Sequence, residues 1–311
     1  MKMRWFLFWC CSLLAVMPCF GADVGTVTLL DGKPRLLRGT AWFTLVEGVR
    51  IRDSDVIDVP EKAQLQLELT DGGALSLIGP GALYSVSATP GDAKARPLAE
   101  FWVTKGWLKL DTKPTATRLR TRTGMGSVLT TDAAAVIRLT SDTLDVFVET
   151  GSAKVIEPGK SDSAGVEVRG GAFVSRAAGK PFIPAERAPS TFVGALPRDF
   201  MDALPLRASR FATSREPVPE REASYAEVQS WLTGPYRVAF MKRFEPKLAD
   251  PAFKAAAEAN SKATPEWATV AKPAPGPAAA VVPAKVEPPK EEKKAEPERT
   301  WRWPWEKAAG K

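Results

Sequence analysis

The chain contains no histidine, and its three cysteines, Cys10, Cys11 and Cys19, all lie close to the N-terminus. Histidine is the most frequent general base near neutral pH and the commonest metal ligand. A thiolate is needed for cysteine catalysis and for soft metal sites. Carboxylates are present, but alone they give little specificity for sugar hydrolysis. The composition therefore predicts a noncatalytic protein with no cofactor and no metal.

Residues 1–22 have the pattern of a cleaved signal peptide. Lys2 and Arg4 form a short positive region, an apolar run follows, and small residues come after Pro18. The run is shorter than the roughly 20 residues that span a bilayer, which disfavours the alternative of an uncleaved anchor. A lipoprotein would use Cys19, but proline precedes it where a small residue is expected. We therefore expect a periplasmic protein without disulfides, since cleavage removes every cysteine.

The charge of the chain is mildly basic. The formal net charge is +7, from 43 basic and 36 acidic residues. Cleavage would remove Lys2 and Arg4 and no acid, which leaves 41 basic residues against 36 acidic ones, or +5. The folded part shows no dense basic stripe with interleaved aromatic residues, so we expect no nucleic-acid partner.

The most regular pattern is a β-hairpin over 63–78. Apolar and polar residues alternate along its first arm, and Asp71-Gly72 stands where a tight turn needs glycine. The alternation predicts one buried and one exposed face, occupied respectively by Leu65, Leu67 and Leu69 and by Gln64, Gln66 and Glu68.

Similar short strand candidates continue over 23–185, separated by Gly and Asp turns. This spacing predicts a mainly β domain, a sandwich or roll of short antiparallel strands. Turns are expected at Asp53-Ser54, Gly124-Met125 and Gly151-Ser152. The acidic cluster around Asp53, with Asp55 and Asp58, could offer oxygen ligands to calcium, but the rest of a calcium loop is missing. A turn is therefore the favoured interpretation.

Three tryptophans fall within these strand patterns, namely Trp42, Trp102 and Trp107. Aromatic residues in such patterns are more often buried in a core than exposed as ligand platforms. We therefore expect these three to be core residues.

A small helical segment is predicted over 186–270. Ser224 and Glu227 match a capping box that opens a helix. The spacing predicts one apolar face made by Val228, Trp231 and Leu232, and a second made by Val238, Met241 and Phe244. Asp250-Pro251 predicts the start of a further helix over 252–263.

The C-terminal part is different in composition. Residues 271–300 are rich in Pro, Ala, Lys and Glu, which predicts a disordered linker. Residues 301–311 follow as a Trp-rich tail, whose candidate docking residues are Trp301, Arg302, Trp303 and Trp305. Tryptophan beside a basic residue suits a membrane interface or a docking pocket. The alternative is a mobile end without function.

The β domain resembles the FecR domain family. The matching residues, in chain order, are Gly25-x-Val27, Asp31-Gly32, Leu45-x-x-Gly48, Asp55-x-Ile57, the run from Ala63 to Gly72, and Leu75-x-Leu77-x-Gly79. Later runs are similar to the second half of the same domain, at Trp107–Leu110, Thr130-x-Asp132-Ala133 and Val146-x-Val148-Glu149-x-Gly151. Together they cover 24–178. The resemblance implies a β-rich periplasmic module that contacts protein partners.

These observations predict a noncatalytic binding or scaffold protein of the cell envelope. The resemblance adds a role in signalling through protein–protein contacts, without direct control of a sigma factor, because no cytoplasmic anti-sigma segment is found ahead of the predicted signal peptide. The expected partner is an envelope protein, and a membrane surface is a further candidate. Peptidoglycan or another glycan is the alternative ligand, and an envelope hydrolase is a remote one.

Overall fold

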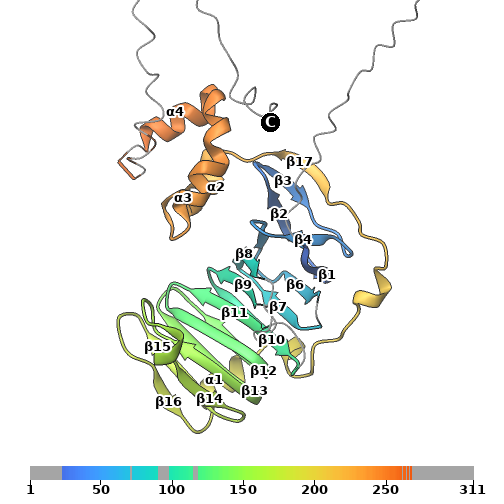
Figure 1. Ribbon diagram of the computed structural model, residues 1–311, viewed down its shortest axis with the longest axis vertical. Coiled ribbons are helices and arrows are strands. Elements are labelled where there is room, and N and C mark those ends of the chain that lie inside the picture. The colour runs from blue at the N-terminus through green and yellow to red at the C-terminus, as the bar shows by residue number, and fades with distance from the viewer. Residues whose placement is uncertain are drawn as a thin grey trace, which may run out of the picture.

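The computed structural model describes residues 23–70, 72–89, 98–114 and 118–260, together with residues 262, 263, 265 and 267. This part of the chain is mainly β, with helices near its C-terminal end, as the sequence predicts (Figure 1). The predicted signal peptide, the linker 271–300 and the tail with Trp301, Arg302, Trp303 and Trp305 lie outside the described residues.

The strands form two layers that share one long hairpin. The first sheet has the order β4-β1-β6-β7-β10-β12-β13-β15-β16, and the second has the order β17-β3-β2-β5-β8-β9-β11-β12-β13-β14. Strands of the first sheet alone are β1 (Asp23–Asp31), β4 (Arg50–Arg52), β6 (Gln64–Leu69), β7 (Ala74–Ile78), β10 (Gly106–Thr112), β15 (Phe173–Ala177) and β16 (Ile183–Ala185). Those of the second are β2 (Arg35–Arg38), β3 (Ala41–Thr44), β5 (Val56–Val59), β8 (Gly81–Thr89), β9 (Leu98–Val103), β11 (Arg118–Thr123), β14 (Val166–Arg169) and β17 (Val218–Glu222).

The shared hairpin consists of β12 (Gly126–Leu139) and β13 (Thr143–Ile156). The first half of β12 pairs with β11 and its second half with β10, so the strand passes from one sheet to the other. Thr131 and Glu149 are extra residues in the ladder, and such bulges bend a strand. The turn predicted at Gly151-Ser152 is therefore wrong. Both residues lie inside β13, where Gly151 has a φ of +70° beside the bulge.

Among the described strands, all pairs but one are antiparallel. β9 and β11 are parallel, because the chain between them crosses to the first sheet as β10 and returns. This departs from the expected roll of antiparallel strands, and the two 14-residue strands of the shared hairpin depart from the expected short lengths.

The hairpin predicted over 63–78 is present as β6 and β7, with Leu67 opposite Leu75. Its leucine face is buried between the sheets, as predicted. The expectation of an exposed polar face is wrong, because Gln66 and Glu68 are only 1% and 6% exposed. A later part of the chain covers them, as described below.

The central core lies between the two sheets and is built from the inward side chains of both. A second apolar cluster lies on the outer face of the second sheet, where Tyr84 and Trp42 meet the C-terminal helices. A third lies on the outer face of the first sheet, where Phe173 and Val136 meet α1 (Ser190–Ala195). Trp42 is buried as expected, whereas Trp102 and Trp107 are half-buried under these covers.

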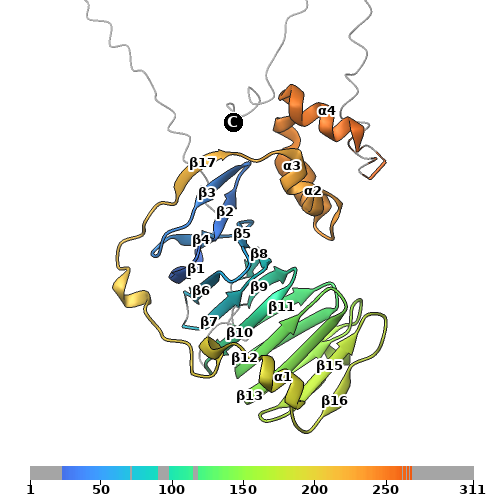
Figure 2. The same ribbon diagram turned by 180° about the vertical axis from the view of Figure 1, so that it is seen from behind.

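Residues 196–217, which we call the strap, connect α1 to β17. The strap contains the short 3-10 helices Arg198–Phe200 and Ala208–Arg210 and is otherwise irregular. In Figure 2 it leaves α1, follows the outside of the first sheet and reaches β17 at the other end of the molecule. β17 then pairs with β3 at the edge of the second sheet. The range 186–222 is therefore mostly irregular chain, and the larger helices begin after it.

The helical cover consists of α2 (Tyr225–Thr233), α3 (Arg237–Phe244), a 3-10 turn over Glu245–Ala249 and α4 (Pro251–Ala259). The capping box at Ser224 is present, and Asp250 caps α4 by accepting from the amides of Ala252 and Phe253 at 2.9 and 3.4 Å. None of the helices among the described residues is both long and apolar enough to cross a bilayer.

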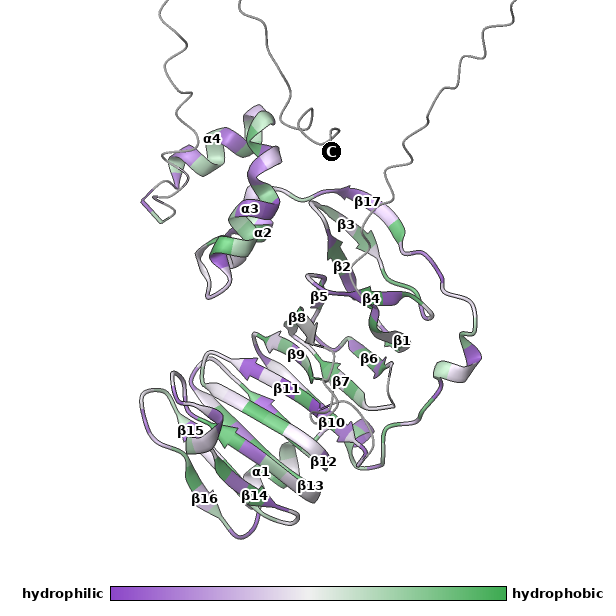
Figure 3. Cartoon of the chain, in the orientation of Figure 1, coloured by the Kyte–Doolittle hydropathy of each residue, from purple (hydrophilic) through white to green (hydrophobic). Residues whose placement is uncertain are grey.

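The first predicted helical face is confirmed, since Val228, Trp231 and Leu232 are all buried. The second is partly wrong. Val238 is 74% exposed, and Phe240 is buried with the expected Met241 and Phe244. Two of the three predicted positions are therefore on the buried face, and Phe240 takes the place of Val238. Figure 3 shows that green segments of α2 and α3 lie among purple ones, as in a cover with one apolar side.

Candidate functional site

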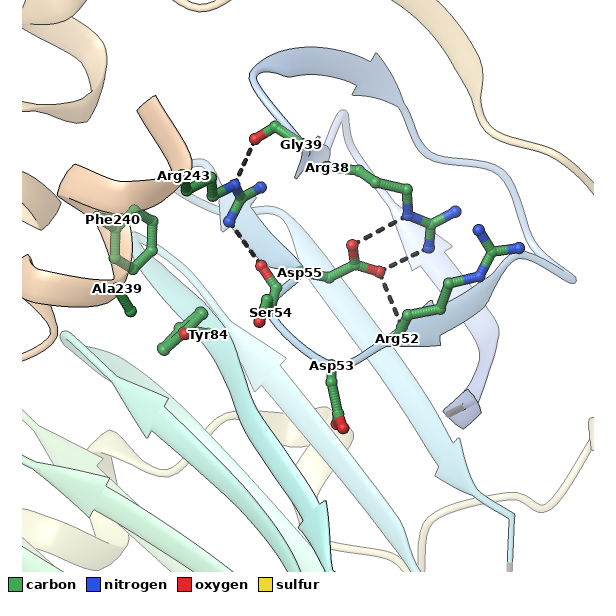
Figure 4. Close-up of a pocket in the computed structure, with 10 residues that line it drawn as sticks. All are labelled: Arg38, Gly39, Arg52, Asp53, Ser54, Asp55, Tyr84, Ala239, Phe240 and Arg243. Carbon is green, nitrogen blue, oxygen red and sulfur yellow. Dashed lines mark hydrogen bonds and ion pairs between the residues drawn. The ribbon is translucent and has the colours of Figure 1, made fainter. Parts of the chain in front are cut away.

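A pocket of about 440 Å³ lies where α3 meets two turns, one within the second sheet and one that leads from β4 to β5 (Figure 4). One turn joins β2 to β3 and contains Gly39. The other lies at Asp53-Ser54, where the sequence predicts it. Gly39 and Ser54 both have positive φ angles, 59° and 69°, which let the chain reverse tightly and turn carbonyl groups toward α3.

Arg243 of α3 holds the two turns together. Its guanidinium donates to the carbonyl oxygens of Ser54 at 2.6 Å, Leu37 at 2.9 Å and Gly39. Burial is the main cause that lowers the pKa of Arg243 to about 10, with Asp55 acting in the opposite direction. The group therefore remains charged at neutral pH, and three of its N–H groups are used within the protein.

A second arginine, Arg38, is paired with the carboxylate of Asp55, which directly follows the Asp53-Ser54 turn. Arg38 forms two bonds with the Asp55 carboxylate, Nε to Oδ1 at 3.0 Å and Nη2 to Oδ2 at 2.6 Å. The carboxylate also accepts from the amide of Arg52 at 2.8 Å. Asp55 is only 2% exposed, so this ion pair orders the turn from the inside.

The aromatic wall of the pocket comes from Tyr84 of β8 and Phe240 of α3, whose ring centroids are 5.0 Å apart. Burial is the main cause that raises the pKa of Tyr84, and the Ser54 side chain opposes it through a hydrogen bond. The phenol is therefore neutral over the physiological range. Ala239 lies beside Phe240 on α3 and is exposed at the same pocket.

A second pocket, of about 550 Å³, lies between α2 and the strands β2, β3 and β5. Trp42 and Trp231 contribute aromatic rings, and Arg35 lies 4.5 Å from the Trp42 ring centroid. Arg35 also bridges two carboxylates, Asp58 at 3.2 Å and Glu227 at 3.9 Å. The arrangement combines two largely buried aromatic rings with charged hydrogen-bonding groups.

The acidic residues that could be read as a calcium loop instead serve as arginine partners, Asp55 with Arg38 and Asp58 with Arg35. In the described ranges, no cluster of three or more His, Cys, Asp or Glu side chains is placed to hold a metal ion.

No pattern in the sequence marks Arg38, Tyr84 or Arg243 as pocket residues. Arg243 acts on carbonyl groups about two hundred positions earlier in the chain, at separations of 189 to 206 residues, and no local pattern reports such a contact. The two turns of this pocket, at Arg38-Gly39-Thr40 and at Asp53-Ser54, do carry a turn signal in the sequence, and both are present.

Comparison with known proteins gives little information about family or function. No family model matches the chain, and no curated protein matches it. Two crystal structures of a candidate anti-sigma factor from Parabacteroides distasonis, at 1.65 and 2.50 Å resolution, are similar to it. Their sequence identities are 14% and 13%, and their TM-scores are 0.34 and 0.35. Each match covers 42% of this chain and 59% of the other, so this chain spans less than two thirds of the protein it matches. A likeness this distant decides neither family nor function.

Proposed function

We propose that this is a noncatalytic binding protein of the periplasm, which contacts another envelope protein through the pocket between α3 and the Gly39 and Ser54 turns. The observation that carries the proposal is the internal pairing of the charged groups at this pocket. Arg38 is held by Asp55, and Arg243 by three carbonyl groups. The pocket is lined by the rings of Tyr84 and Phe240, which are 4% and 1% exposed, and Ala239 at its rim is exposed to solvent.

The protonation states at the pocket also support binding rather than reaction. A general acid or base works best with a pKa near the working pH. Arg243 has a pKa of about 10, and the pKa of Tyr84 is raised above its ordinary value of 10.0. Neither group changes charge near neutral pH. Pockets of this kind, aromatic with a few fixed polar groups, are typical of binding sites.

The proposal is tested by placing a photo-crosslinking residue at Ala239 in cells and irradiating them. Val238 is the matched control, because it is the neighbouring residue on α3, is 74% exposed and does not line the pocket. We expect one discrete protein adduct from position 239 and none from position 238. The cell fraction in which the adduct is recovered also shows whether the protein is periplasmic, as proposed.

A second variant decides whether the pocket itself is used. Ala239→Trp places a large ring at the rim, where the site is open, and should abolish capture of the partner without changing thermal stability. Capture that is equal from positions 238 and 239, or that survives Ala239→Trp, would contradict the proposed contact.

Glycan binding is the second candidate, favoured by the pocket at Trp42 and Trp231. Aromatic rings beside carboxylates and an arginine can hold a sugar ring through its apolar face and its hydroxyl groups. Sedimentation with purified peptidoglycan tests this function. Binding that is lost in Ser230→Trp, at the same pocket, and retained in Ala239→Trp would favour the glycan over the protein partner.

Hydrolysis is less well supported at that pocket. A glycosidase acid needs a raised pKa, so that it holds a proton at neutral pH. The pKa of Glu227 is instead lowered to about 2, mainly by hydrogen bonds from Arg221 and further by the Ser224 amide. Glu227 is therefore a fixed negative charge, which suits holding a ligand.

The Trp-rich tail remains a predicted docking element that would add to the contact at the pocket. Replacing Trp301, Trp303 and Trp305 together by Ala should weaken association with envelope material and leave the melting temperature unchanged. A lowered melting temperature with unchanged association would show that these side chains pack on the folded part.

A further inference from the structure

In the described part of the chain the two sheets have four edges, and three of them are blocked. β16 contains Pro184, and β17 contains Pro219, and proline removes a backbone donor from an edge. The edge at β4 is covered by the strap, since Val49 forms a bridge with Arg215 and the Arg215 amide donates to the Gly48 carbonyl at 3.1 Å.

The fourth edge, β14, has none of these protections. Among the described residues its one neighbouring strand is β13, and its sequence is Val166-Glu167-Val168-Arg169. The Gly170 amide, just after the strand, donates to Gly151 of β13 at 2.8 Å. Backbone groups alternate in direction along an antiparallel strand. Those of Val166 and Val168 therefore face β13, and those of Glu167 and Arg169 face the open edge.

The side chains of β14 alternate as well. Val168 is 4% exposed and points into the core, so Glu167 and Arg169 share the outer face of the sheet. Their side chains are 57% and 85% exposed, and their closest charged atoms are 3.9 Å apart. At that distance and exposure the contact within one strand is weak, and both groups can find other partners.

We propose that β14 pairs with β14 of a second copy of this chain, in antiparallel orientation about a two-fold axis at Val168. This register sets Glu167 opposite Arg169 of the other copy, twice by symmetry. The two residues are those whose backbone groups face the edge, so the same register also forms the ladder hydrogen bonds. The strand is thus self-complementary in charge and in backbone direction, as a two-fold interface requires.

Apolar surface at the same end of the molecule fits this partner. Val166 on β14 is 45% exposed and Ile183 on β16 is 65% exposed, and both strands lie at the end furthest from β17 and α4 (Figure 1). A contact built on one short strand is smaller than a standard interface, so the dimer should be weak and depend on concentration. The dimer is independent of the proposed pocket and would display two copies of it.

The test is the oligomeric state of the purified chain, measured by analytical ultracentrifugation over a wide concentration range. Like charges directly opposite each other destabilise a strand pair. Glu167→Arg and Arg169→Glu should each place like charges opposite and weaken the dimer about tenfold or more, since both symmetric pairs are affected. The double variant Glu167→Arg with Arg169→Glu restores complementarity and should restore the dimer.

Hydrogen exchange gives a second readout. The amides of Glu167 and Arg169 should exchange more slowly at high protein concentration, while that of Arg210 in the strap should not change. A chain that is monomeric throughout, or a dimer that both single reversals leave unchanged, would overturn the proposal. Circular dichroism of each variant distinguishes a lost dimer from a lost fold.

Discussion

The outer faces of the two sheets are covered in different ways. The first sheet is covered in part by α1, through an aromatic cluster that Phe200 of the strap joins, and otherwise by the strap, which it holds mainly through buried polar side chains. Lys109 donates to the Phe200 carbonyl at 2.8 Å, Gln66 donates to the Pro205 carbonyl at 2.7 Å, and Glu68 accepts from the Ala208 amide at 3.0 Å. The second sheet is covered by helices through aromatic packing, with Tyr84 5.8 Å from the Trp231 ring.

The backbone of each cover explains the difference. A helix satisfies most of its own amides and carbonyls, so it can dock through an apolar face alone. An irregular segment has no such internal pairing, and buried backbone groups must find partners elsewhere. The first sheet supplies these partners from its outward side chains. A polar outer face is thus the complement of an irregular cover, and an aromatic outer face is the complement of a helical one.

The sharpest test of the helical cover is Phe244→Ala. Phe244 is fully buried on α3 and stacks against Phe253 of α4 at 5.9 Å. Removing the ring should lower the free energy of unfolding by about 3–5 kcal/mol, because apolar transfer and a cavity both contribute. Urea unfolding measures the loss.

Val238→Ala on the same helix is the control for that loss. Its side chain is 74% exposed, so the change should stay within about 0.5 kcal/mol. Equal losses for the two variants would show that α3 docks by a different face.

The strap is tested by Lys109→Met, which keeps the length of the side chain and removes its charge. Lys109 is 1% exposed, and it also forms an ion pair with Glu149 at 2.8 Å. Glu149 is the extra residue of a bulge in β13, and the bulge turns its carboxylate toward Lys109. We expect a loss of about 1.5–3 kcal/mol in the free energy of unfolding, as for a hydrogen bond to a charged group. Faster hydrogen exchange around Phe200 should accompany it. A variant as stable as the parent would mean that the strap is held by its apolar residues.

The helical cover was the more predictable of the two from sequence. Its capping box, its first apolar face and the Asp250 cap are local signals, and each is found in the structure. The face of α3 was misplaced because Val238 and Phe240 both fit an apolar stripe over such a short helix. Only the packing against Tyr84 selects Phe240.

The strap could not be predicted in this way. Alternation along β6 gives the same pattern whether its polar face meets water or a strap that lies 139 residues further along the chain. The candidate pocket depends on contacts at even longer separation, through Arg243. The long hairpin was divided at Gly151 because glycine is typical of both turns and bulges, and the neighbouring sheets decide which one forms.

A smaller effect is expected from Gln66→Ala. The substitution leaves the Pro205 carbonyl without its donor, and the side chain also bonds to Thr28 at 3.2 Å. Each of the two lost hydrogen bonds should cost about 0.5–1.5 kcal/mol. Gln64→Ala is the matched control, because Gln64 lies on the same face of β6 and bonds to Ser76 instead. Limited proteolysis within 205–211 should be faster in the first variant alone, and equal rates would contradict the assigned contact.

The smallest effect concerns pH at the rim of the helical cover. The pKa of Glu227 is lowered to about 2 from an ordinary value of 4.5, mainly by the hydrogen bonds from Arg221 at 2.7 and 2.8 Å. A carboxyl group whose pKa is lower in the folded state stabilises the fold above its unfolded pKa. That contribution should therefore be complete above pH 4.5 and fall away between pH 4.5 and about pH 2. The pair is largely exposed, so the change in melting temperature should be small.

Glu227→Gln should be less stable than the parent above pH 4.5, and the gap should close as the pH falls toward 2. Arg221→Ala should raise the pKa of Glu227, which titration by carbon-13 NMR would report directly. A gap that stays constant over this range would show that Glu227 acts on α2 through its shape and hydrogen bonding, without a contribution from its charge.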